Sequence, residues 1–153
     1  MAAKIEDAWN EVYNELVAAK ATGQPLVFVK TISQGLRDDL AGYPLIVMEP
    51  DNETEDQRTV PAHKNLFFTL KLVLMLETGN KDKQIIGGGG TDDSVGILDF
   101  VAAVKNVLSQ TMNLNGKCIQ FSFPNTIYIF ETYPYRLAEI SMLIELIATD
   151  TQR

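Results

Sequence analysis

The first twenty residues carry apolar side chains at helical spacing. Acidic and amide side chains fill the opposite side, and the early acids Glu6 and Asp7 suit the positive end of a helix dipole. Gly23 and Pro25 are typical of a helix end. The pattern predicts an amphipathic helix over about residues 4–20, with one apolar stripe formed by Ile5, Ala8, Trp9, Val12, Tyr13 and Leu16.

Short apolar runs predict the next elements. Residues 26–29 are expected to form a strand, and the polar residues 31–42 a loop. Pro44 favours an extended entry into a second strand at residues 45–48. The stretch 51–61 is almost wholly polar, which predicts a long exposed excursion.

The clearest strand signal lies at residues 65–77, where side chains alternate with period two. The opposite face of this strand is mixed, because Phe67, Val73 and Met75 stand among polar residues. A half-apolar face often packs on a helix or on another subunit. We therefore take Phe67, Val73 and Met75 as candidate inter-subunit interface residues. The wholly apolar face carries Leu66, Phe68, Leu70, Leu72, Leu74 and Leu76.

A second helix is predicted over about residues 93–112. Asp92, Asp93 and Ser94 are candidate caps at its beginning. The preceding residues 79–90 end in four consecutive glycines and predict a loop. The apolar stripe of the helix is Ile97, Leu98, Val101, Val104, Leu108 and Met112.

Three β segments are predicted after this helix, at residues 118–123, 126–132 and 137–147. The last segment also fits a helix face, but alternation covers more of its residues and favours a strand. No repeat or change in composition divides the chain. The sequence therefore predicts a single domain, residues 1–153, of class α+β, with a mostly antiparallel β-sheet flanked by two helices.

The charge balance argues against binding to the DNA backbone. The 153 residues carry 20 acids against 13 basic residues, a formal net charge of -7. A DNA-binding surface needs a basic footprint, and this chain lacks one in bulk. No apolar run approaches the ~20 residues that a membrane span needs, so no membrane partner is expected. Cys118 is the only cysteine, which excludes an internal disulfide and a cysteine metal cluster.

The residues that carry chemistry are sparse. His63 is the only histidine, so a zinc site would have to rest mainly on carboxylates. The glycine run is followed by Thr91 and two acids, where a phosphate-binding loop needs lysine. The acids around residues 51–56 lack the spacing of a calcium loop. We expect no catalytic, cofactor-binding or metal site, and we expect that the protein is not an enzyme.

The order of elements resembles the tail terminator proteins, also called tail completion or neck proteins, of tailed bacteriophages and related contractile or gene-transfer particles. The shared layout is an amphipathic first helix, a strand entered through Tyr43-Pro44, an acidic excursion, and the long alternating strand. A glycine-rich loop, a second helix and closing strands follow. The resemblance covers nearly the whole chain.

The resemblance implies a structural, non-catalytic subunit of the virion, assembled in the host cytoplasm. Six copies would form a ring that caps the tail tube, stops its polymerisation and joins the tail to the head. The implied partners are further copies, the tail tube protein, head–tail connector or neck proteins, and the sheath where one exists. DNA would pass through the lumen without specific binding. Candidate lumen or ring-contact residues, all expected in loops, are Glu53, Glu55, Asp56, Asp92 and Asp93.

Three other functions stay open at this point. One is another ring protein of the neck or head–tail connector, or a tube protein. The second is a non-enzymatic adaptor module, monomeric or dimeric, which a large apolar patch without oligomerisation would favour. The third is a carboxylate-dependent enzyme, which is disfavoured by the single histidine and the missing phosphate loop.

Overall fold

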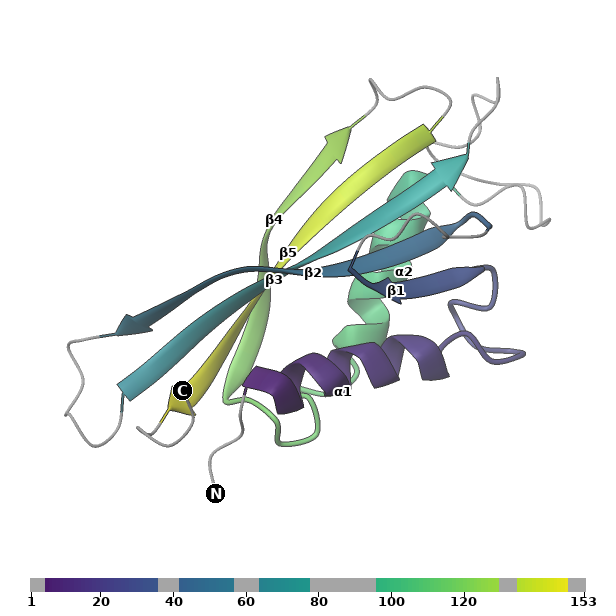
Figure 1. The fold of residues 1–153 in the computed structure, drawn as a ribbon. Helices are drawn as coiled ribbons and strands as arrows, with labels where there is room; N and C mark the ends of the chain where they lie inside the picture. Colours follow the sequence, from purple (N-terminus) through teal and green to yellow (C-terminus); the bar gives the residue numbers. More distant parts are fainter. Residues whose placement is uncertain (1–4, 36–41, 57–63, 78–95, 130–134, 149–153) are drawn as a thin grey trace.

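The chain folds as an α+β structure, as the sequence predicted. The computed structural model describes residues 5–35, 42–56, 64–77, 96–129 and 135–148. Its elements follow the order α1, β1, β2, β3, α2, β4, β5 (Figure 1). Their bounds are Ile5–Ala18 for α1, Thr31–Gln34 for β1, Leu45–Asp56 for β2, Lys64–Glu77 for β3, Ile97–Leu108 for α2, Gln120–Ile129 for β4 and Tyr135–Ala148 for β5.

The five strands form one twisted sheet in the order β1-β2-β3-β5-β4. Only the β1–β2 pair is parallel, and the other three pairs are antiparallel. β3 lies at the centre and pairs with β5 along its whole length, from Lys64 opposite Ala148 to Glu77 opposite Tyr135. This pairing confirms the predicted strands at 65–77 and 137–147. Both were predictable because their apolar and polar residues alternate strongly.

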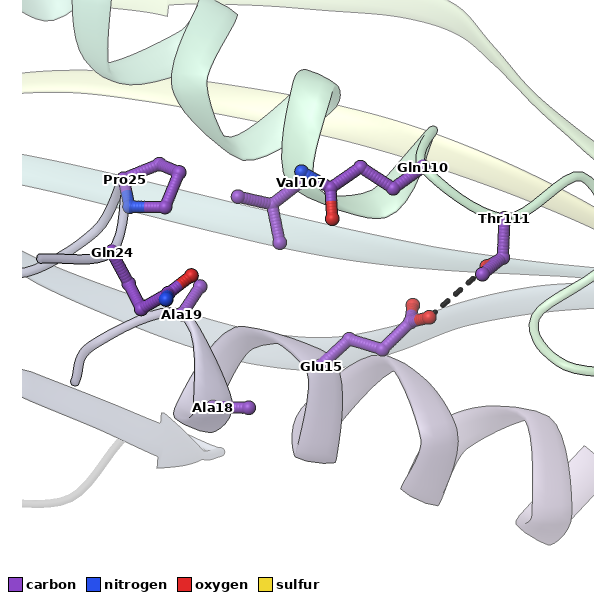
Figure 2. Close-up of a pocket in the computed structure, with 8 residues that line it drawn as sticks. All are labelled: Glu15, Ala18, Ala19, Gln24, Pro25, Val107, Gln110 and Thr111. Atoms are coloured by element: carbon purple, nitrogen blue, oxygen red, sulfur yellow. Dashed lines mark hydrogen bonds between the residues drawn. The ribbon is translucent and has the colours of Figure 1, made fainter.

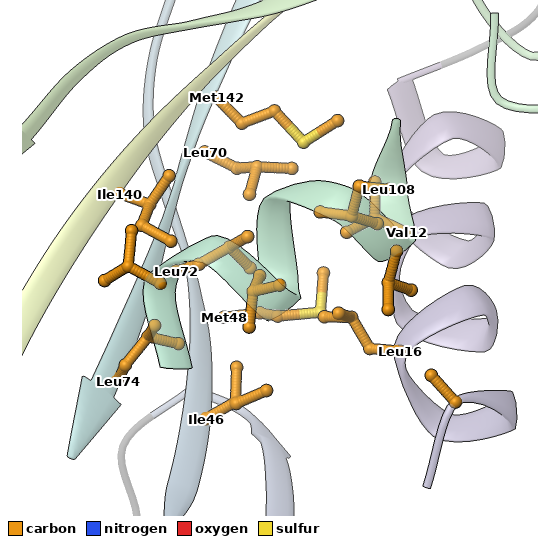
Figure 3. Close-up of a cluster of buried hydrophobic side chains, with 14 of the residues drawn as sticks. Val12, Leu16, Ile46, Met48, Leu70, Leu72, Leu74, Leu108, Ile140 and Met142 are labelled. Carbon is orange, nitrogen blue, oxygen red and sulfur yellow. The ribbon is translucent and has the colours of Figure 1, made fainter. Parts of the chain in front are cut away.

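Both helices pack on one face of this sheet. The alternating leucines of β3 turn toward them, and Leu70, Leu72 and Leu74 are each 0% exposed. Val12 and Leu16 of α1 belong to the same core cluster, together with residues of α2 and β5 (Figure 3). Trp9 packs edge-on against Phe68, with ring centroids 6.5 Å apart, so the α1 stripe predicted from spacing is the packed face of that helix.

The first strand lies further along the chain than predicted. Residues 26–28 form a turn, and β1 occupies Thr31–Gln34, within the predicted loop. The amides of Val27 and Val29 donate to the carbonyls three residues earlier. Leu26 and Val29 are buried in the core, so this apolar run anchors a turn, and the predicted strand at 26–29 is wrong.

The second strand is longer than predicted. β2 continues to Asp56, so residues 51–56 form a strand and the expected excursion is wrong for that half. β1 covers only Leu45–Met48 of β2, so the remainder lies at the edge of the sheet. Proline and polar side chains are tolerated at an edge, and a register shift between Pro50 and Asn52 marks the irregularity.

The strands predicted at residues 118–123 and 126–132 are one strand, β4. Pro124 lies within it, at a register shift between Ser122 and Asn125. β4 is also an edge strand, and a bulge there accommodates a residue that cannot donate to the ladder.

The second helix is shorter than the predicted 93–112. α2 begins at Ile97 with Gly96 as its N-cap, and that cap makes no side-chain hydrogen bond. The expected caps Asp92, Asp93 and Ser94 lie outside the described residues, as does the predicted loop at 79–90. After α2, Leu114 and Asn115 have positive φ angles of 51° and 56°, and Leu114 is fully buried.

Candidate interaction surface on the outer face of the sheet

The face of the sheet turned away from the helices is the candidate site, and we call it the outer face. Residues directly opposite in paired strands point to the same side, so the register assigns its members. From β3 it carries Phe67, Thr69, Lys71, Val73 and Met75. The neighbouring strands add Leu45, Val47 and Glu49 from β2, Leu137, Glu139, Ser141, Leu143 and Glu145 from β5, and Ile127 and Ile129 from β4.

One end of the outer face holds a second, smaller apolar cluster. Leu45 and Val47 are each 1% exposed and Val73 is 8% exposed. Met75 packs against them from its place in the register between Leu45 and Leu137. None of the described helix residues belongs to this cluster, so it is separate from the main core.

The other end of the outer face is held by polar contacts. The Glu145 carboxylate accepts two amide hydrogen bonds, from Asn65 Nδ2 at 2.9 Å and from Gln120 Nε2 at 2.6 Å. Between the two ends, next to Val73, Lys71 Nζ lies 3.9 Å from Glu139 Oε2. Phe67 sits beside Glu145 in the register and is half-buried. The Phe67 end therefore combines a partly accessible ring with a carboxylate, Glu145, that already has two hydrogen-bond partners.

The three predicted interface residues do share this face, but the structure does not bring them all together. Val73 and Met75 meet in the apolar cluster. Phe67 lies six residues from Val73, which is about 20 Å along a strand. Val73 is too well buried to offer a partner much area, while Phe67 and Met75 stay partly accessible. Their role as an interface stays a prediction.

The predicted acidic residues are placed differently from expectation. Glu53 is exposed, and Glu55 and Asp56 follow it in the same strand, so these three are strand residues rather than loop residues. Asp92 and Asp93 lie outside the described residues. The extension of β2 to Asp56 could not be predicted, because the polar composition of residues 51–56 is typical of a loop. Their proposed place at a lumen stays a prediction.

A groove of about 180 Å³ lies between α1 and the end of α2 (Figure 2). Glu15 projects into it, and its Oε1 accepts a hydrogen bond of 3.0 Å from Thr111 Oγ1. Glu15 Oε2 is buried without a hydrogen-bond partner. Burial raises the pKa of Glu15 above its ordinary value, the Thr111 hydrogen bond opposes that rise, and the nearby Glu11 charge adds to it.

The polar residues at the groove connect α1 with the segment that follows α2. Glu11 Oε1 accepts a hydrogen bond of 2.6 Å from Asn115 Nδ2, so two acids of α1 hold the segment that follows α2. Burial, and then the Glu15 charge, raise the pKa of the Cys118 thiol to about 11, which keeps it protonated and unreactive at neutral pH. The sequence could not reveal these contacts, because their partners stand about a hundred residues apart and follow no motif.

Two further observations concern the described residues only. Among them there is no group of three or more histidine, cysteine, aspartate or glutamate side chains that could hold a metal ion. His63 lies outside this part of the chain. Neither described helix is long and apolar enough to cross a membrane.

Comparison with known proteins shows a likeness in fold to a solved structure. No family model matches the chain, and no curated protein matches it. Among solved structures, the fold is similar to a chain from the virion of a native gene transfer agent (GTA) particle, with a TM-score of 0.60. The match covers 90% of this chain and 92% of that chain, at 10% sequence identity. At this identity the likeness shows a shared fold along nearly the full length of both chains.

Proposed function

We propose that the protein is a structural component of a phage-like virion, and that within it the chain is a tail terminator subunit. The observation that carries the proposal is the likeness in fold to a GTA virion chain over 90% of this chain. The order of elements, which resembles tail terminator proteins, supports the same class from the sequence side. In this proposal the subunit forms a hexameric ring that caps the tail tube, stops its growth and joins the tail to the head.

The outer face supports an assembling role. A ring needs a heterologous interface, in which one patch of a subunit binds a different patch of its neighbour. Phe67 and Met75 are accessible apolar side chains on a face that the described helices leave uncovered. We propose that this face contacts a neighbouring subunit, the tail tube protein or a connector protein in the assembled particle.

The net charge supports a ring that lets DNA pass without binding it. With a net charge of -7, a ring of six copies would repel the phosphate backbone rather than hold it. The proposal is also non-enzymatic. In the groove, the Glu15 carboxylate is engaged by Thr111 in a contact between α1 and the segment after α2, which supports a structural role.

The proposal is tested by the mass and the location of the protein. Light scattering of the protein alone, across a concentration series, should give a species near six times 17.0 kDa. When tail tubes of the same particle are added, the protein should bind to them as a ring. Negative-stain images should show a ring with a central hole, and immunogold labelling should mark the head-proximal end of the tail. A protein that stays monomeric both alone and with tubes would overturn the ring. Label at another position of the virion would favour a different connector or tube protein.

A further inference from the structure

The two edges of the sheet differ in composition and in protection. A strand at a sheet edge exposes unpaired backbone groups, which natural proteins usually guard with charged side chains. β4 has no described strand on its outer side, and its ten residues Gln120–Ile129 include no charged residue. Ile127 within it is 48% exposed. Pro124 and its bulge interrupt only the first part of the strand, which leaves Thr126–Ile129 regular.

The opposite edge of the sheet is formed by the short strand β1 and, beyond its end, by an acidic part of β2. β1 pairs only with Leu45–Met48, so the part of β2 that follows has no described strand on that side. We call residues 49–56 the open part of β2. It has no basic residue, and its acids are Glu49, Asp51, Glu53, Glu55 and Asp56.

The directions of the two edges match. β2 is antiparallel to β3, β3 to β5, and β5 to β4, so β4 runs antiparallel to β2. Two copies placed side by side in the same orientation therefore bring β4 of one copy against β2 of the next as an ordinary antiparallel pair. Pairing of β2 with β2 would instead set acids against acids, whereas β4 brings no charge.

We propose that β4 of one copy pairs with the open part of β2 in the next copy, so that the sheet continues from subunit to subunit. This inference rests on the ring proposed above and names the contact that closes it. Within one copy, the register runs across the sheet from Ile129 through Leu137 and Met75 to Leu45. An unshifted neighbour would therefore bring its Ile129 level with Leu45, but β1 already pairs with Leu45 on that side. β4 of the neighbour must therefore shift by four residues, about 13 Å, to meet Glu49. Strands that tilt in a closed assembly produce such a stagger.

A disulfide tests the pairing directly. The shifted register, with the β2 bulge included, places Ile127 of one copy opposite Asn52 of the next. Within one copy the two positions lie on strands three spacings apart, about 14 Å or more, so an internal disulfide cannot form. Oxidised I127C/N52C rings should give cross-linked multimers up to the full ring on non-reducing gels. Placing the second cysteine at Glu49 or Thr54 covers a shifted register, and the chain with buried Cys118 alone is the control.

The outcomes separate the two proposals. Rings that form without any cross-link from the three pairs would overturn the edge pairing and leave the ring intact. Cross-linking of I127C alone to a dimer would show symmetric β4–β4 pairing and also overturn it. A chain that forms neither rings nor cross-links, alone or on tail tubes, would overturn both proposals.

A matched pair of charges gives an independent test. Ile127→Glu places an acid against the acidic open part of β2, and Ile127→Lys places a base there. Both changes remove the same exposed apolar side chain. Ile127 also lies opposite Glu139 of its own copy, so the glutamate variant meets an acid there with or without a ring. The decisive result is therefore rescue, and Asn52→Lys should restore ring formation at low salt in the Ile127→Glu variant. Failure of Asn52→Lys to restore the rings of the Ile127→Glu variant would contradict the proposed partner strand.

Discussion

Glu15 shows how one side chain can make the stability of this fold depend on pH. Its carboxylate bridges α1 to Thr111, but one oxygen is buried without a partner. Burial raises the pKa of Glu15 in the folded protein above the ordinary value of 4.5. At a pH between the pKa of the unfolded state and that of the folded state, the folded state therefore binds more protons than the unfolded state. The free energy of unfolding therefore falls as pH rises through that window.

Glu15→Gln should remove this dependence. The amide oxygen can still accept the Thr111 hydrogen bond, while the buried charge is gone. We expect the variant to be more stable than the parent at pH 7, and the difference to shrink as pH falls toward 4. Urea unfolding at pH 4, 5.5 and 7 measures it, and a difference that stays constant with pH would refute the assignment to this carboxyl.

Thr111→Val probes the same contact from the other side. It removes the donor and leaves both Glu15 oxygens without a partner, so it should lower the free energy of unfolding at pH 7 by about 1 kcal/mol. Gln110→Val, at an exposed neighbour, is the control and should change stability little. Equal effects of the two substitutions would mean that the hydrogen bond contributes nothing to stability.

At the scale of elements, the predictable parts are those with strong periodicity, namely α1, β3 and β5. The errors lie where a distant strand decides the outcome. Polar residues 51–56 form a strand because β3 lies beside them, and Pro124 is accepted because β4 stands at an edge. The outer face of β3 was predicted from alternation, but the burial of Val73 depends on Leu45 and Val47, which long-range pairing brings to it.

The outer face makes a prediction that separates assembly from folding. Phe67→Asp and Met75→Asp should keep the monomer folded and weaken ring formation, since both side chains are partly accessible. Val73→Asp should instead destabilise the fold by several kcal/mol, because it buries a charge in the small cluster. Circular dichroism and light scattering distinguish these cases. Asn106→Asp, on the exposed side of α2, is the charge control. Normal rings from both accessible variants would exclude this face as an interface.

At the scale of the whole molecule, the negative net charge predicts that the assembled ring does not bind DNA. A ring of subunits that each carry -7 should let duplex DNA pass without retaining it. We expect no retardation of linear DNA on gels at about 50 mM salt, a concentration at which proteins with many phosphate contacts bind strongly. Retardation that disappears at higher salt would reveal a basic patch and argue against a passive lumen.

The place of β5 in the sheet has a consequence for synthesis. β5 pairs with β3 on one side and with β4 on the other, yet it is translated after both. Until residues 135–148 leave the ribosome, the central strand of the sheet has only one neighbour and β4 has none. Most of the sheet therefore cannot pair until β5 has been made, and the apolar strands made earlier stay exposed until then. A nascent chain with exposed apolar strands is prone to aggregation, so the late synthesis of β5 makes early folding intermediates of this protein vulnerable.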